Sequence, residues 1–184
     1  IASTIFAISA EESRFTLNGA LLILRDTGLV MVATDGHRLA LTEKQIPLTG
    51  LNVAYRALLT KKAMNEIQKL ASDDSSKQIE FSANENHLFF RIDKRLLLSR
   101  KLTGNFPDYE RVLPKEHPHM VVVARDELKA AIERVAQFAD ERSRAIRVRA
   151  GKGELKVYSS ISETGESEET IPIEYNGPEV EIGF

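Results

Sequence analysis

The chain has 184 residues, 42% of them hydrophobic and 28% charged, which is enough for one large or two small globular domains. Its formal net charge of -2 excludes a protein-wide basic surface for nucleic acid, so any contact with phosphate has to be local. The absence of cysteine excludes disulfides and thiolate metal sites and fits a reducing compartment.

The first quarter of the chain predicts a short helix end followed by a β-meander. Residues 1–8, IASTIFAI, are mostly apolar, and we expect the end of a helix there. From 15 to 47, short apolar runs are separated by hairpin-type turn residues at Asn18-Gly19, Asp26-Thr27-Gly28 and Asp35-Gly36. Because the chain begins without Met and stops within an alternating strand, we also expect a fragment of a longer protein.

An amphipathic helix is predicted over residues 60–71. Thr60 is the expected N-cap, and apolar residues recur with helical spacing along one face. The opposite face carries Lys61, Lys62 and Lys69. From the residues alone, a solvent-exposed helix face is the favoured interpretation of these lysines.

Strands return after this helix and end at a proline-containing segment. They are predicted over 78–83, 87–93 and 95–104. Residues 104–120 carry three prolines and follow neither the helical nor the strand period, so we expect a rigid connector with Phe106 and Tyr109 as packing anchors. The candidate domain boundary lies at 114–118.

The second part of the chain predicts a strand, a helix and another meander. The strand covers 120–124, the helix covers 126–139 with Asp126 as its cap, and the meander begins near residue 145. The acidic run SETGESEET at 162–170 is expected on a strand edge, where charge protects against aggregation.

The two parts resemble each other. SAEESR at 9–14 and ADERSR at 139–144 agree in residue type and order, and each precedes a meander containing GLVMVAT at 28–34 or GELKVYS at 153–159. This layout predicts a duplicated domain.

The stretch TDGHR at 34–38 admits three interpretations. Asp35-Gly36 is typical of a hairpin turn. A metal site is disfavoured because only two possible ligands, Asp35 and His37, lie close together in the sequence, and such a site needs three or four converging ligands. A hydrolase using Asp35 and His37 stays open, although the chain has neither a G-x-S-x-G nor a G-x-x-x-x-G-K pattern.

ATDGHRLA at 33–40, FPDYERVLP at 106–114 and the duplicated layout resemble the bacterial DNA sliding clamps, the β subunits of DNA polymerase III. The resemblance covers the whole chain. It implies an α+β DNA clamp fold with duplicated domains, antiparallel sheets outside and helices on the inner face. We expect the middle domain at 1–114, a connector at 115–120 and the first half of the last domain at 121–184.

The resemblance also implies a function. Clamps of this family are homodimeric rings that encircle duplex DNA without reading its sequence, and they are not enzymes. They tether DNA polymerase subunits, the clamp loader and repair proteins, which insert short linear motifs into a pocket. No cofactor or metal is implied, and the expected location is the cytoplasm, in association with the nucleoid. A β-rich adaptor or peptide-binding scaffold with no role on DNA stays open as the alternative.

Three sets of site residues follow from the resemblance, position by position. The peptide pocket is expected at Leu17, Thr34, Gly36, His37, Arg38, Leu39, Pro107 and Val112. The residues expected to face DNA are Arg14, Phe15, Lys61, Lys62 and Lys69. The dimer interface is expected at Gln137, Phe138, Glu163, Glu166, Glu168 and Glu169.

Overall fold

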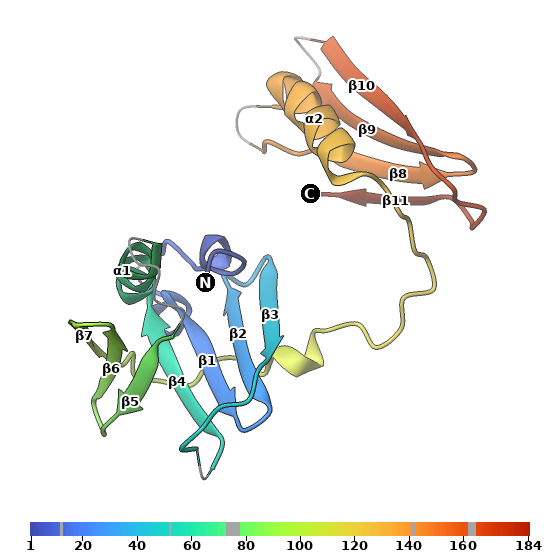
Figure 1. Ribbon diagram of the computed structural model, residues 1–184. Coiled ribbons are helices and arrows are strands. Elements are labelled where there is room, and N and C mark those ends of the chain that lie inside the picture. The colour runs from blue at the N-terminus through green and yellow to red at the C-terminus, as the bar shows by residue number, and fades with distance from the viewer. Residues whose placement is uncertain (12, 52, 73–77, 141–142, 162–164) are drawn as a thin grey trace. The chain divides into compact units, whose positions relative to one another are not determined.

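The computed structural model describes residues 1–11, 13–51, 53–72, 78–140, 143–161 and 165–184. The chain forms two compact units, residues 1–113 and 114–184, each built on antiparallel sheet (Figure 1). None of the helices in these ranges is long and apolar enough to cross a membrane.

The first unit begins with a four-stranded antiparallel sheet in the order β3-β2-β1-β4. Its strands are β1 Gly19–Arg25, β2 Gly28–Thr34, β3 Leu39–Gln45 and β4 Tyr55–Thr60. The predicted meander is therefore confirmed. The predicted hairpin turn at Asn18-Gly19 is wrong, because a 3-10 turn (η2, Phe15–Leu17) precedes β1 and the described residues before it form no strand.

Helix α1, Lys61–Ser72, follows β4 as predicted, and the amide of Ala63 donates a hydrogen bond to the Thr60 hydroxyl at 3.0 Å. A second antiparallel sheet then forms from β5 Glu80–Ala83, β6 His87–Ile92 and β7 Arg95–Arg100. The expected helix end at residues 1–8 is only one 3-10 turn, η1, over Ile5–Ala7.

Both faces of the first sheet are buried at the inner strands β1 and β2, which explains the unbroken apolar run in β1. On one face, the sheet packs against α1 and β6 through residues that include Leu22, Met64 and Leu88. On the other face, Leu21 and its neighbours are covered by the segment 102–109, in which Tyr109 is buried and belongs to the 3-10 turn η3, Tyr109–Arg111. The proline-containing segment is thus fixed to the sheet of the first unit.

The second unit repeats the sheet of the first. It contains α2 Arg125–Val135, the 3-10 turn η4 Ala136–Phe138, and strands β8 Arg147–Gly151, β9 Glu154–Ile161, β10 Gly165–Pro172 and β11 Val180–Gly183. The strand order β10-β9-β8-β11 matches β3-β2-β1-β4 in pairing and in chain order. This identity of topology confirms the predicted duplication.

Two predictions for the second unit are wrong. Residues 120–124 form no strand. Val121 and Val123 pack against the core of this unit, whereas Val122 between them and the two flanking residues are exposed, so the alternation reflects packing without a strand partner. Asp126 is not the helix cap, because α2 begins at Arg125 and Asp126 forms an ion pair with it at 2.8 Å. The helix also ends at Val135, and η4 follows.

Candidate functional site

The stretch TDGHR forms the connection between β2 and β3, and side chains hold its backbone. The amides of His37 and Arg38 each donate to Asp35 Oδ1 at 3.0 Å. The Thr34 hydroxyl accepts from the Gly36 amide at 3.0 Å and donates to the Arg38 carbonyl at 2.7 Å. Gly36 has φ = 91°, a conformation that favours glycine. The hairpin-turn interpretation is therefore confirmed.

Asp35 acts as a structural acceptor in this turn. Hydrogen bonds from the Arg38 backbone, the His37 backbone and the Arg38 side chain lower the pKa of Asp35 below its ordinary value, and they outweigh the opposing effect of partial burial. Arg38 Nε lies 3.1 Å from Asp35 Oδ2. A carboxylate engaged in this way favours the ionised form and has low basicity, which argues against its use as a general base.

Two polar residues that we expected to contact a bound peptide, Thr34 and Arg38, instead form hydrogen bonds within the chain. Thr34 is only 8% exposed, and its hydroxyl both donates and accepts within the turn. Arg38 pairs with Asp35 and also donates from Nη2 to the carbonyl of Phe6 at 2.8 Å. The His37 side chain is exposed, and within the described residues its imidazole makes no hydrogen bond or ion pair. Of these three, His37 is the one whose side chain remains available.

The four expected apolar residues all belong to the first unit. Leu17 and Leu39 are half-buried, Pro107 is exposed, and Val112 is 68% exposed. Leu39 and Phe106 pack against the same buried cluster on one face of the sheet, so the turn and the segment that carries Pro107 are attached to the same surface. Pro107 and Val112 therefore present apolar surface to solvent on the same unit as the turn.

A cavity of about 620 Å³ lies elsewhere on the first unit. Its walls come from β1, β4 and the segment 101–110, including Leu21, Arg56 and Asn105. Of the residues expected in the peptide pocket, Pro107 alone lines it. No local pattern in the sequence could have indicated this cavity, because it arises where the connector crosses the sheet.

Some of the residues expected to face DNA already have partners within the chain, and others are exposed. Lys61 and Lys62 are exposed on α1, opposite the buried Ala63, Met64 and Ile67. Lys69 is exposed but forms an ion pair with Glu66 at 3.0 Å. Phe15 is 73% exposed, whereas Arg14 is held by Glu11 at 2.8 Å and by the carbonyl of Asp35. The described part of α1 thus keeps a basic exposed face.

The residues expected at a dimer interface lie on the edge of the second unit. The edge strand β10 carries Glu166, Glu168 and Glu169, and η4 carries Gln137 and Phe138, which is 47% exposed. Glu163 lies outside the described residues.

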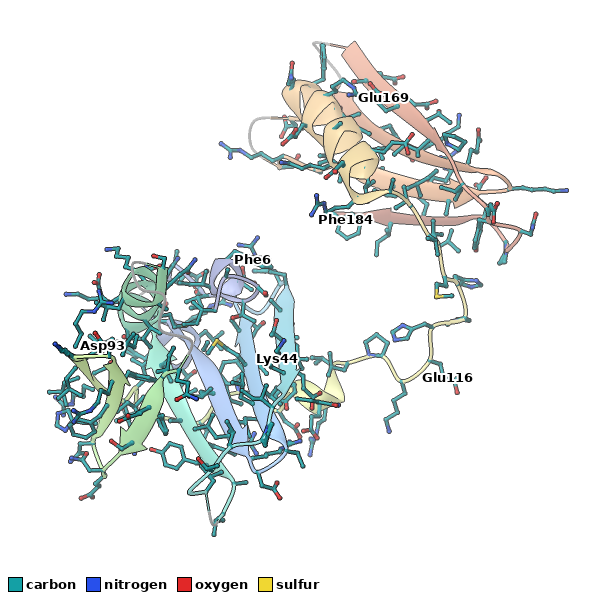
Figure 2. The ribbon with its side chains drawn as sticks, viewed as in Figure 1. Phe6, Lys44, Asp93, Glu116, Glu169 and Phe184 are labelled. Atoms are coloured by element: carbon teal, nitrogen blue, oxygen red, sulfur yellow. The ribbon has the colours of Figure 1, made fainter. Side chains whose placement is uncertain are left out.

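Two of these edge carboxylates have partners within the chain. Glu169 receives two hydrogen bonds from Arg134 of α2, at 2.6 and 3.1 Å, which lower the pKa of Glu169 and raise that of Arg134 (Figure 2 labels Glu169 on β10). Glu168 lies 3.0 Å from Lys156. The acidic edge is therefore partly neutralised by its own unit.

The described residues contain no group of three or more histidine or carboxylate side chains placed to hold a metal ion.

Comparison with known proteins identifies two families along the chain. The family model of the DNA polymerase III beta subunit, central domain, matches residues 1–108, and that of the C-terminal domain matches residues 110–184. The beta sliding clamp of Proteus mirabilis is 34% identical over 186 residues, covering 100% of this chain and 50% of the relative. This chain therefore spans about half the length of the curated relatives that it matches.

Solved structures agree with the sequence match. A DNA polymerase III subunit beta from Pseudomonas aeruginosa has a TM-score of 0.93 at 33% identity, covering 100% of this chain and 50% of that one. A second structure of the sliding clamp from this organism, bound to griselimycin, has a TM-score of 0.92 at 33% identity, covering 100% of this chain and 49% of that one. The chain belongs to the DNA polymerase III beta subunit family, the bacterial sliding clamps.

Proposed function

We propose that this chain is part of a processivity clamp that encircles duplex DNA as a homodimeric ring and tethers DNA polymerase subunits, the clamp loader and repair proteins. The observation that carries the proposal is the hydrogen-bonded TDGHR turn on the same unit as the exposed Pro107 and Val112, in a chain similar along its whole length to sliding clamps. The proposed domain limits are 1–114 for the middle domain, 115–120 for the connector and 121–184 for part of the last domain.

The turn and its surroundings form one wall of a docking site for short linear peptides. Leu17, Leu39, Pro107 and Val112 accept the hydrophobic anchors of the peptide, because burying their exposed surface is favourable. The His37 imidazole is the polar contact, since Thr34 and Arg38 are engaged within the fold. The role of Thr34 and Arg38 is then to fix the shape of the turn.

Lys61, Lys62 and Lys69 of α1 face the DNA and contact phosphates without reading bases. Each phosphate contact adds affinity that falls by roughly 0.9 log units for each log unit of salt concentration. A few such contacts suit a ring that slides and is retained by its closed shape. Phe15, exposed before β1, is a further contact in this proposal.

The edge strand β10 and the turn η4 form the subunit interface of the proposed ring. Gln137, Phe138 and the edge glutamates face the other subunit, and Arg134 and Lys156 set how much acidic charge remains there. The proposed protein is not an enzyme and needs no cofactor, and Asp35 with His37 serves docking instead of hydrolysis. It works in the cytoplasm, in association with the nucleoid.

Peptide binding tests this proposal. A fluorescent peptide carrying a glutamine and a hydrophobic pair is titrated with the intact clamp, and Kd is measured by polarisation. Leu17→Ala and Val112→Ala are each expected to weaken binding about tenfold, because buried apolar anchors dominate such interfaces. Leu96→Ala is the matched control, since Leu96 is a 59% exposed leucine on β7. A clamp that fails to bind the peptide, or equal Kd values for all variants, contradicts the docking proposal.

A further inference from the structure

The segment before β1 touches the TDGHR turn from outside it. Arg14 Nη1 donates to the carbonyl of Asp35 at 2.8 Å, across 21 positions of sequence. Arg14 Nε meanwhile lies 2.8 Å from the Glu11 carboxylate, which orients the guanidinium. A β-carbon added to Gly36 would lie 2.9 Å from Arg14 Nη1. The Arg14 guanidinium therefore occupies the space that a side chain at position 36 would need.

A second contact joins the same segment to the turn in the opposite direction. Arg38 reaches out of the turn, and its Nη2 donates to the carbonyl of Phe6 at 2.8 Å. The Arg38 guanidinium carbon also lies 5.8 Å from the centre of the Phe6 ring, within range of a cation–π interaction. Phe6 is 56% exposed, on η1 (Figure 2). The phenyl ring of Phe6 therefore packs against the Arg38 guanidinium and is not part of the core.

We propose that Phe6 and Arg14, which lie before β1, form a brace that sets the shape of the docking turn and act as its positioning residues. This inference rests on the proposed docking function and assigns Arg14 to the docking turn instead of to DNA. Asp35 and Thr34 organise the turn from within, and the hydrogen bonds of Arg14 and Arg38 attach it to the segment before β1. The hydrophobic side chain of a peptide then contacts a surface that already has its bound conformation, which lowers the conformational entropy lost on binding.

Two readouts on the intact clamp test the brace. Peptide Kd is measured as above, and amide hydrogen exchange is followed at Gly36, His37 and Arg38. Arg14→Ala and Phe6→Ala are each expected to raise Kd about fivefold, the effect of one lost hydrogen bond or cation–π contact. Exchange at the three turn amides should rise with no change in α2, which lies in the other unit. Arg14→Lys keeps a cationic donor and should restore part of the affinity.

Glu11→Gln is the matched control. It removes the charge that pairs with Arg14 but leaves the donor to the Asp35 carbonyl, so Kd should change by less than about twofold. Unchanged Kd and unchanged turn exchange in Arg14→Ala and Phe6→Ala would overturn the brace. So would an Arg14→Ala variant that changes only the salt dependence of DNA retention, because that pattern assigns Arg14 to DNA.

Failure of the proposed function has a different signature. If the unmodified clamp does not bind the peptide, docking itself fails, and with it the role of the brace in docking. Hydrogen exchange would then still report whether Arg14 and Phe6 hold the turn.

Discussion

At the scale of single residues, most polar side chains of the TDGHR turn form hydrogen bonds within the turn itself. The Asp35 carboxylate accepts from two backbone amides and from Arg38, and Thr34 bridges Gly36 and Arg38. The Asp35, Thr34 and Arg38 side chains therefore form hydrogen bonds that hold the loop, whereas the His37 side chain is exposed. The hydrolase alternative needs Asp35 as a base, and the hydrogen bonds that lower the pKa of Asp35 argue against that role.

Gly36 provides a residue-scale prediction. Its φ of 91° is costly for any residue with a β-carbon, and Arg14 Nη1 would lie 2.9 Å from that carbon. Gly36→Ala should lower the free energy of unfolding of the first unit by about 1–2 kcal/mol, measured by urea denaturation. Gly50→Ala is the matched control. Gly50 also has a positive φ, 79°, but a β-carbon added there would meet none of the described atoms within 4 Å outside its chain neighbours. Equal losses at both positions would show that the contact with Arg14 adds nothing.

At the scale of elements, exposed ladders of charge reinforce the sheet of the second unit. Glu181 on β11 lies 2.9 Å from Arg147 and 2.7 Å from Arg149, both on the neighbouring strand β8. Tyr158 on β9 accepts a hydrogen bond from Arg149 at 3.1 Å. These contacts connect three adjacent strands on one face, while Val148, Ala150, Leu155 and Val157 belong to the core.

The ladder predicts a dependence of stability on pH. Hydrogen bonds from Tyr158, Arg147 and Arg149 lower the pKa of Glu181 from 4.5 to about 2. The stabilisation is therefore complete above about pH 4.5 and is lost as the pH falls toward 2. Glu181→Gln should be less stable than the unmodified chain at pH 6, and the difference should shrink by pH 3. Thermal unfolding at both pH values measures it.

The control for this prediction is Glu179→Gln, whose carboxylate lies 4.0 Å from Arg149, at the limit of an ion pair. It should destabilise the chain less than Glu181→Gln does at pH 6. A difference for Glu181→Gln that is constant from pH 6 to pH 3 would contradict the proposed ladder.

At the scale of the whole molecule, two units with the same strand order suit a closed ring of similar domains. We predict that the intact clamp, loaded on a nicked circular DNA, stays bound after a wash in high salt and leaves once the circle is cut. Retention on circular and linear DNA alike would indicate ordinary binding, and retention on neither would favour the adaptor without a DNA role. Band-shift or gel-filtration analysis of labelled clamp distinguishes these outcomes.

Much of this architecture could be predicted from local patterns. The helix α1 follows from one cap and a regular apolar face, and the meanders follow from hairpin-type turns between apolar runs. The strand proposed at 120–124 was wrong because a strand needs a neighbour, and alternation alone does not supply one. The cap at Asp126 was wrong by two positions, since Ala124 occupies the N-cap.

The candidate site also has one part that could be predicted from the sequence and one part that could not. TDGHR could be recognised as a turn because Asp-Gly and the flanking strands are neighbours in sequence, and local hydrogen bonds decide its form. Other features depend on contacts between residues that are distant in sequence. Arg14 donates to the carbonyl of Asp35, Arg38 donates to the carbonyl of Phe6, and Leu39 and Phe106 pack on one cluster. Only the packed fold brings such groups within hydrogen-bonding distance, because local propensity carries no information about which distant residues will meet.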